Sequence, residues 1–137
     1  MENLKADIQS LKSELIELRR DFHAYPELGF QEFKTADRVE AYLEDLGLKP
    51  ERIATTGVTA YLEGKKDGPT ILLRADMDAL PIQEENNVPY KSRNNGIMHA
   101  CGHDAHMAML LGAAKICSGM RDRLEGNIKF LFQPNEE

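Results

Sequence analysis

The chain has 137 residues, of which 42% are hydrophobic and 29% are charged, a length and composition typical of one globular domain. Its net charge of −6 argues against the basic surface that binds nucleic acid, and its longest apolar stretch is too short to span a membrane. Two cysteines are too few for a disulfide framework, and the first residues lack an apolar leader segment, so we expect a cytoplasmic protein.

Two amphipathic helices are predicted in the first third of the chain. Apolar residues recur at spacings of three and four over residues 4–22, which is the pattern of a helix with one apolar face. That helix is expected to end near Pro26, because the residue before a proline disfavours helical geometry. A second helix is predicted over residues 33–46, with Gly47 placed to adopt the left-handed conformation that ends many helices.

Three strands and a third helix are predicted in the rest of the chain. Residues 58–63 alternate like a strand, whereas residues 70–73 are continuously apolar, as expected of a central strand buried on both faces. Residues 84–96 are polar and rich in asparagine, which predicts a loop. The remaining elements are a helix over residues 105–118, closed by Gly119, and a final strand over residues 127–132. This order predicts a layered α/β domain with helices packed on both faces of a sheet.

Three polar clusters stand out against this pattern. Residues 74–78 and residues 133–137 each follow the carboxyl end of a predicted strand, and residues 99–106 lead into a helix. In open α/β sheets, ligand sites gather at the carboxyl ends of the strands. We therefore expect the three clusters to meet in one crevice.

The cluster over residues 99–106 contains three of the four histidines and one of the two cysteines. Cys101 and His103 flank a glycine, so a tight loop can turn a thiolate and an imidazole toward one or two shared metal ions. The N-terminus of the following helix should favour the thiolate over the thiol. The alternatives are a buried structural cysteine beside hydrogen-bonded histidines and a Cys–His nucleophile pair. The density of ligands in this short stretch favours metal binding.

Two adjacent carboxylates, Glu136 and Glu137, follow the last predicted strand directly. One can coordinate a metal ion while its neighbour acts as general base on a water molecule that the ion activates. The alternative is a solvated acidic turn, which is the commoner fate of such a pair. The nearby Cys/His cluster favours the metal interpretation.

Asp76 and Asp78 follow the predicted strand over residues 70–73, where alternate residues can face the same side. An aspartate at this position can orient a ligating histidine and determine which ring nitrogen carries the proton. The alternative is that these carboxylates cap the end of the strand, with Arg74 as an ion-pair partner. The residue types do not distinguish the two.

The other histidines and the second cysteine are assigned from their positions. His23 suits the negative end of the first helix, so we interpret it as structural. His99 and His106 flank the central motif and could orient a ligand or face a substrate. Cys117 is interpreted as a small core residue of the third helix.

These motifs together resemble the N-terminal part of M20-type metallopeptidases, in their amidohydrolase branch. That branch includes hippurate hydrolases, N-acyl-L-amino-acid amidohydrolases, auxin-conjugate hydrolases and N-acetyl-diaminopimelate deacetylases. The resemblance covers nearly the whole chain and rests on ordered motifs in register. They are Arg19-Arg20-Asp21-Phe22-His23 with Pro26-Glu27-Leu28-Gly29-Phe30, Leu73 to Pro81, Met98 to His106, and Phe132 to Glu137.

The resemblance implies an α/β zinc-peptidase-like catalytic domain with a dinuclear site, often filled by Mn²⁺, Zn²⁺, Co²⁺ or Ni²⁺. It implies that Cys101 and His103 are ligands, with Cys101 bridging, that Glu137 is a ligand, and that Glu136 is the general base. Asp78 resembles the orienting aspartate of the family, and Asp76 is the second candidate for that role. The usual proline-alanine before the glutamates is Pro134-Asn135 in this chain.

The resemblance further implies hydrolysis of the amide bond of N-acyl amino acids or related conjugates. Members of the family are longer, and they supply further histidine ligands and a lid or dimerisation domain downstream of the double glutamate. We therefore expect residues 1–137 to be the N-terminal portion of the catalytic domain, inactive alone, from a parent enzyme that forms a homodimer. The alternative is a short module that binds metal without catalysis or is vestigial.

Overall fold

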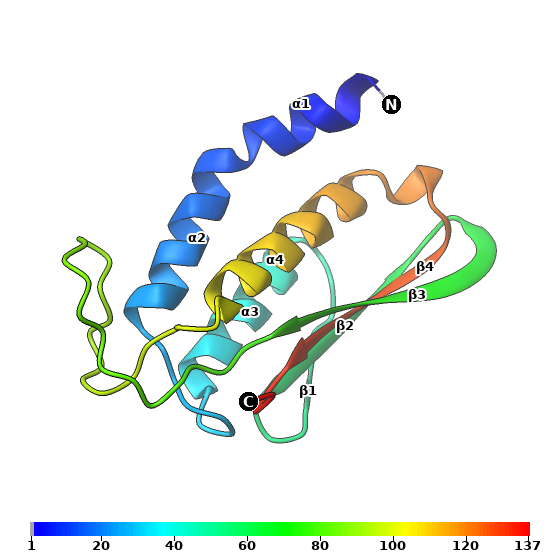
Figure 1. The fold of residues 1–137 in the computed structure, drawn as a ribbon. Helices are drawn as coiled ribbons and strands as arrows, with labels where there is room; N and C mark the ends of the chain where they lie inside the picture. Colours follow the sequence, from blue (N-terminus) through cyan, green and yellow to red (C-terminus); the bar gives the residue numbers. More distant parts are fainter. Residues whose placement is uncertain (1) are drawn as a thin grey trace.

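The computed structural model describes residues 2–137, and these form helices packed against a twisted sheet (Figure 1). Helices α1 (Glu2–Ser10), α2 (Lys12–Ala24) and α3 (Phe33–Asp45) come first in the chain. They are followed by strands β1 (Glu51–Ile53), β2 (Gly57–Glu63) and β3 (Lys66–Asp76). Helix α4 (His103–Gly119), the short 3-10 helix η1 (Arg121–Arg123) and strand β4 (Glu125–Gln133) complete the described fold.

The sheet has the strand order β1-β2-β4-β3 and is mixed. Strand β2 pairs antiparallel with both β1 and β4, whereas β3 runs parallel to β4. The parallel pairing places Asp76 opposite Gln133, so the carboxyl ends of β3 and β4 lie side by side. The polar clusters after these two strands are therefore brought together, as the sequence predicts.

The core lies between the sheet and helices α2, α3 and α4. Phe130 and Phe132, two alternate residues of β4, are fully buried together with Met107 and Leu111 of α4. The half-buried Cys117 packs against this core, in agreement with its predicted role. Burial of such aliphatic and aromatic side chains contributes about 1.5–3 kcal/mol each to folding.

The predicted α/β class is confirmed, but the arrangement of the helices differs from the prediction. In the part of the chain that the structure describes, the helices lie on one face of the sheet, and α3 and α4 contact each other there (Figure 1). On the opposite face, side chains such as Tyr61 and Lys129 of paired strands are exposed. Alternation of strands and helices predicts layers, but it does not say on which face each helix packs.

Strand β3 also differs from its prediction, because it lies at the edge of the described sheet. The side chains of Ile71 and Leu72 are 58% and 53% exposed, so the strand is not buried on both faces in residues 2–137. It begins at Lys66, and its pairing with β4 is irregular between Lys66 and Thr70. An apolar run shows that a strand is suited to burial, but its neighbours in the sheet come from the rest of the fold.

The helix boundaries depend on local backbone geometry. The single helix predicted over residues 4–22 is interrupted at Leu11, which gives α1 and α2. Gly47 has φ +77°, which confirms the left-handed end of α3. Helix α4 begins at His103, two residues before its predicted start, because Gly102 has φ +89° and turns the chain into the helix.

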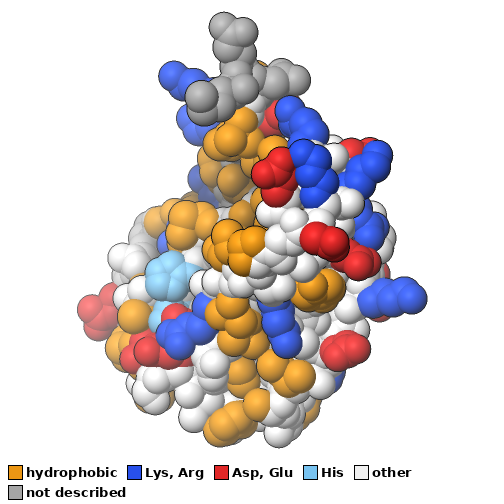
Figure 2. Space-filling view, turned by 90° about the vertical axis from the view of Figure 1, so that its right-hand side faces the viewer, with side chains coloured by type: hydrophobic (Ala, Val, Ile, Leu, Met, Phe, Trp, Pro, Cys, Tyr) orange, Lys and Arg blue, Asp and Glu red, His pale blue; other side chains and the backbone are white. Residues whose placement is uncertain are grey.

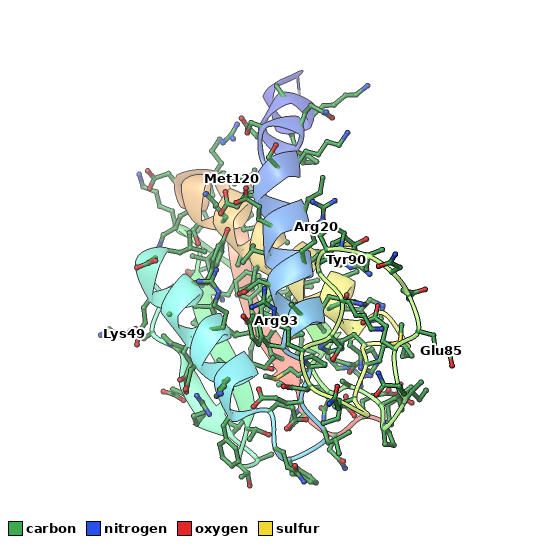
Figure 3. All side chains as sticks on the ribbon, turned by 90° about the vertical axis from the view of Figure 1, so that its left-hand side faces the viewer. Arg20, Lys49, Glu85, Tyr90, Arg93 and Met120 are labelled. Carbon is green, nitrogen blue, oxygen red and sulfur yellow. The ribbon has the colours of Figure 1, made fainter. Side chains whose placement is uncertain are left out.

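The long connection between β3 and α4 is held against α2. The guanidinium carbon of Arg20 lies 4.8 Å from the ring centre of Tyr90, and that of Arg19 lies 5.3 Å from it. Figure 3 shows Arg20 on α2 and Tyr90 on this connection near one another.

Among the described helices, none has both the length and the apolar character needed to cross a bilayer.

Candidate metal centre

The predicted site residues come together where β3, β4 and α4 meet. Asp76 ends β3, His103 is the first residue of α4, and Cys101 lies just before that helix. The backbone N–H of Met77 donates to the carbonyl of Gln133 at 2.9 Å, which continues the pairing of β3 and β4 past Asp76. The chain then turns after β4 and carries Glu136 and Glu137 toward His103.

The turn that presents the two glutamates explains the departure from the family motif at Asn135. This residue has φ +47°, a left-handed conformation that asparagine tolerates better than most residues. Its backbone N–H donates to the buried carboxylate of Glu32 at 2.9 Å. Asparagine therefore fits the local geometry that places Glu136 at the site.

His103 is almost fully buried, and its ring orientation is determined by Asp78. Its Nδ1 lies 2.8 Å from the carbonyl oxygen of Asp78 and 3.2 Å from the Oδ1 atom of the same residue. Because a carbonyl oxygen only accepts, Nδ1 carries the proton and Nε2 keeps its lone pair. Nε2 faces Oε2 of Glu136 at 3.6 Å and Oε1 of Glu137 at 3.8 Å. The contact with Asp78 thus leaves the Nε2 side of the ring available to a cation.

Cys101, His103 and Glu137 each offer a ligand atom, and these atoms all lie within 4.8 Å of one another. A thiolate, an imidazole and a carboxylate suit Zn²⁺ and neighbouring first-row metals. Cys101 and Glu137 are exposed while His103 is buried, so the group opens toward solvent on one side. The donor set therefore fits the predicted metal ions.

The electrostatics of Cys101 differ from the prediction. The pKa of its thiol is raised above the ordinary value, first by a hydrogen bond to Glu137 and further by the negative charges of Glu136 and Asp76. The predicted preference for the thiolate at the start of α4 is therefore outweighed by nearby carboxylates. Such a concentration of negative charge favours a cation, which would lower the thiol pKa in turn.

The remaining histidines have different environments. His99 is buried, neither ring nitrogen has a hydrogen-bond partner in the described residues, and burial lowers its pKa to about 4. The ring of His99 therefore lies beneath the surface of the described residues. His106 is exposed, and its ring centre lies 5.4 Å from that of His103. Asp76, His103 and His106 form a second group of possible metal ligands.

His23 is part of a buried ion network, in agreement with its structural interpretation. Its Nδ1 lies 2.7 Å from Oδ2 of Asp104, and its Nε2 lies 3.0 Å from Oε1 of Glu84. The Nε of Arg19 also lies 2.8 Å from Oδ2 of Asp104. Glu84 does not stand out in the sequence, because a lone acidic residue in a polar stretch has no distinctive spacing. Asp104 lies in the cluster over residues 99–106, but the sequence does not predict its pairing with His23. The network ties α2, α4 and the connection before α4 together.

Comparison with known proteins places these observations in a family. The model of peptidase family M20/M25/M40 matches residues 72–137, which include every residue of the candidate metal centre. The chain is 52% identical over 137 residues to an N-acyl-L-amino acid amidohydrolase of Geobacillus stearothermophilus. It is 44% identical over 131 residues to an N-acetylcysteine deacetylase of Bacillus subtilis.

The alignments cover nearly all of this chain but a minor part of each relative. They span 99% of the chain and 37% of the Geobacillus protein, and 94% of the chain and 34% of the Bacillus protein. The crystal structure of the Bacillus subtilis YXEP protein, described as a dinuclear metal binding peptidase from the M20 family, superimposes with a TM-score of 0.88 at 44% identity. This match covers 92% of the chain and 36% of that protein. In motifs, fold and sequence, the chain belongs to the M20 family of metallopeptidases.

Proposed function

We propose that residues 1–137 form the N-terminal part of the catalytic domain of a metal-dependent amidohydrolase. Its substrates are N-acyl amino acids or related conjugates, whose amide bond it hydrolyses. The observation that carries the proposal is the group of Cys101, His103 and Glu137 with Glu136 beside it. The description of one relative as an N-acyl-L-amino acid amidohydrolase supports this substrate class. A cytoplasmic location and a homodimer of the complete enzyme remain predictions.

Cys101, His103 and Glu137 would hold a divalent metal centre, for which we propose two ions of Mn²⁺ or Zn²⁺, with Co²⁺ or Ni²⁺ as alternatives. When bound, such ions polarise a substrate carbonyl and lower the pKa of a bound water molecule to about 7. The description of a similar structure as a dinuclear metal binding peptidase supports this cofactor. We propose that residues outside 1–137 supply further ligands, because three side chains are few for two ions.

Glu136 is the proposed general base. Its carboxylate is partly exposed and lies 3.6 Å from Nε2 of His103, at the open side of the group. There it can take a proton from the attacking water at Oε and deliver it to the nitrogen of the leaving amine. Glu137 is less suited to this role, because its backbone N–H donates to Asp78 at 3.1 Å and its carboxylate accepts a hydrogen bond from the Cys101 thiol.

Asp78 is the proposed positioning residue of the centre. Its carbonyl and one carboxylate oxygen face Nδ1 of His103, while its other carboxylate oxygen accepts from the backbone of Glu137. One buried side chain thus contacts two of the three proposed ligands. This arrangement keeps both ligands in place when no ion is bound.

The substitution Glu136→Gln in the complete gene product tests the proposal. We expect hydrolysis of N-acetyl amino acids to fall by about 10²-fold or more, with the metal content unchanged, because general-base catalysis contributes about 10²–10⁴-fold. Glu85→Gln is the matched control, since Glu85 is exposed and lies outside the site. Activity of the Glu136 variant within a factor of a few of wild type, with metal bound, would show that the assigned role is wrong.

A further inference from the structure

We infer a second metal position, formed by Asp76, His103 and His106, that receives an incoming ion before it moves to the Cys101 side of His103. We call these three residues the accessory triad. Their ligand atoms all lie within 4.8 Å of one another, as do those of Cys101, His103 and Glu137. The two groups have only His103 in common.

The accessory triad is built by two rigid elements. His103 and His106 are three residues apart on α4, so their side chains lie on the same face of the helix, and their rings are tilted by 34°. Asp76 is the last residue of β3, a strand against which α4 packs. Two histidines and one aspartate on such elements are held close together without a long loop. They offer nitrogen and oxygen donors that suit Zn²⁺, Co²⁺ and Mn²⁺.

The shared histidine makes the two metal positions mutually exclusive. Nδ1 of His103 donates to the carbonyl of Asp78 at 2.8 Å, which leaves Nε2 as the nitrogen available to an ion on either side. A single imidazole nitrogen binds one ion at a time. An ion on the accessory triad must therefore leave it when His103 becomes a ligand of the Cys101 group.

The surroundings of Asp76 support a cation at this place. Its Oδ1 atom is shielded from solvent and makes no hydrogen bond within residues 2–137. The nearest cation is the guanidinium of Arg74, whose Nη2 lies 3.1 Å from this oxygen and whose side chain is about half exposed. Arg74 can swing into solvent, so it competes with a metal ion for Asp76 and does not block the position permanently.

Ligand type gives the direction of transfer, and the accessory triad is open to solvent. Arg74, Asp76, His106 and Met109 line a surface hollow of about 510 Å³, which gives an ion a path from solvent. Histidine side chains reach the surface on the face shown in Figure 2, and His106 is the exposed histidine of α4. The Cys101 group adds a thiolate, which binds Zn²⁺ and Co²⁺ more strongly than oxygen and nitrogen donors alone. An ion should therefore arrive at His106 and finish at Cys101.

Equilibrium binding of Co²⁺ to the metal-free complete gene product tests whether the triad exists. The double variant Cys101→Ser with Glu137→Gln disrupts the Cys101 group and keeps the accessory triad. We expect it to bind Co²⁺ without a sulfur-to-cobalt absorption band, and the further change His106→Gln to weaken that binding by about tenfold or more. Arg74→Gln in the same background should strengthen it. If His106→Gln leaves Co²⁺ affinity unchanged, the triad is not a metal site.

The rate of loading tests the transfer, which rests on the metal centre proposed above. In the otherwise unchanged protein, His106→Gln should slow the appearance of the sulfur-to-cobalt band by about tenfold, with the same final intensity. Glu85→Gln serves as the exposed control and should leave the rate unchanged. An unchanged rate for His106→Gln would overturn the transfer. Absence of the band in the wild-type protein would instead contradict the Cys101 centre, while the binding comparison would still decide the triad.

Discussion

The substitution Glu84→Gln should strongly destabilise the fold, although it changes a single oxygen to an amide nitrogen. Glu84 is 1% exposed, and its Oε1 lies 3.0 Å from Nε2 of His23. Its Oε2 accepts from the backbone N–H of Ser92 at 2.6 Å. A glutamine NH₂ group would face the backbone N–H of Ser92 in one orientation and the side-chain NH₂ of Asn86 in the other. A lost charge-assisted hydrogen bond and an unsatisfied buried donor together predict a loss of about 3 kcal/mol in the free energy of unfolding.

The assay is equilibrium urea unfolding of the metal-free complete gene product, with Glu85→Gln as the matched control. Glu85 is the exposed neighbour of Glu84 (Figure 3), so its substitution should change the free energy of unfolding by no more than about 0.5 kcal/mol. With a slope of about 2 kcal/mol per molar urea, Glu84→Gln should lower the midpoint by about 1.5 M. Equal midpoints for the two variants would refute the energetic role of the network.

The stability difference between the wild type and Glu84→Gln should depend on pH, because Glu84 ionises. Burial raises its pKa, but the hydrogen bonds from Ser92, His23 and Asn86 outweigh burial, so the pKa in the folded protein lies below the ordinary value. A lowered pKa in the folded state gives stability that is present at neutral pH and is lost as the pH falls through that pKa. The gap between the wild type and Glu84→Gln should therefore narrow in acid. A gap that widens as the pH falls would contradict the assignment.

Two further predictions concern the residues around the metal centre. Gly102→Ala should destabilise the start of α4 by about 1–2 kcal/mol, because Gly102 has φ +89°. Gly119→Ala also adds a methyl group in open space and should not destabilise the helix. Thermal unfolding compares the two variants, and equal losses of stability would exclude backbone strain as the cause. In the metal-free protein, Glu137→Gln should lower the pKa of the Cys101 thiol and speed its alkylation by iodoacetamide at pH 8, with the half-buried Cys117 as internal reference. Mass spectrometry measures both rates, and an unchanged rate at Cys101 would show that Glu137 does not control this thiol.

The sequence predicted the location of the candidate site better than it predicted the sheet. The clusters at residues 74–78 and 133–137 follow strands that proved to be parallel neighbours, so the general rule for ligand sites in α/β sheets sufficed. The exposed edge position of β3 could not be predicted, because an apolar run does not reveal which strands pair with it. The packing of the helices on one face of the described sheet could not be predicted either, because the apolar pattern of a helix does not reveal which face of the sheet it covers.

Local sequence patterns do not predict the other features that the structure shows. The break at Leu11 interrupts a continuous apolar pattern, so periodicity alone predicted one helix where the structure has two. The raised pKa of Cys101 comes from carboxylates on β3 and after β4, which a local argument from the helix N-terminus does not include. The pairing of His23 with Glu84 and Asp104 likewise depends on three separate segments of the chain.

Anomalous X-ray diffraction from crystals of the complete gene product, grown with Zn²⁺, tests the central claim most directly. The anomalous difference map calculated from data at the zinc edge should show a peak about 2.3 Å from Sγ of Cys101 and about 2.0–2.1 Å from Nε2 of His103. An oxygen of Glu137 should complete the contacts from this part of the chain. A bound zinc ion that leaves Cys101, His103 and Glu137 without metal contact would contradict the proposed centre.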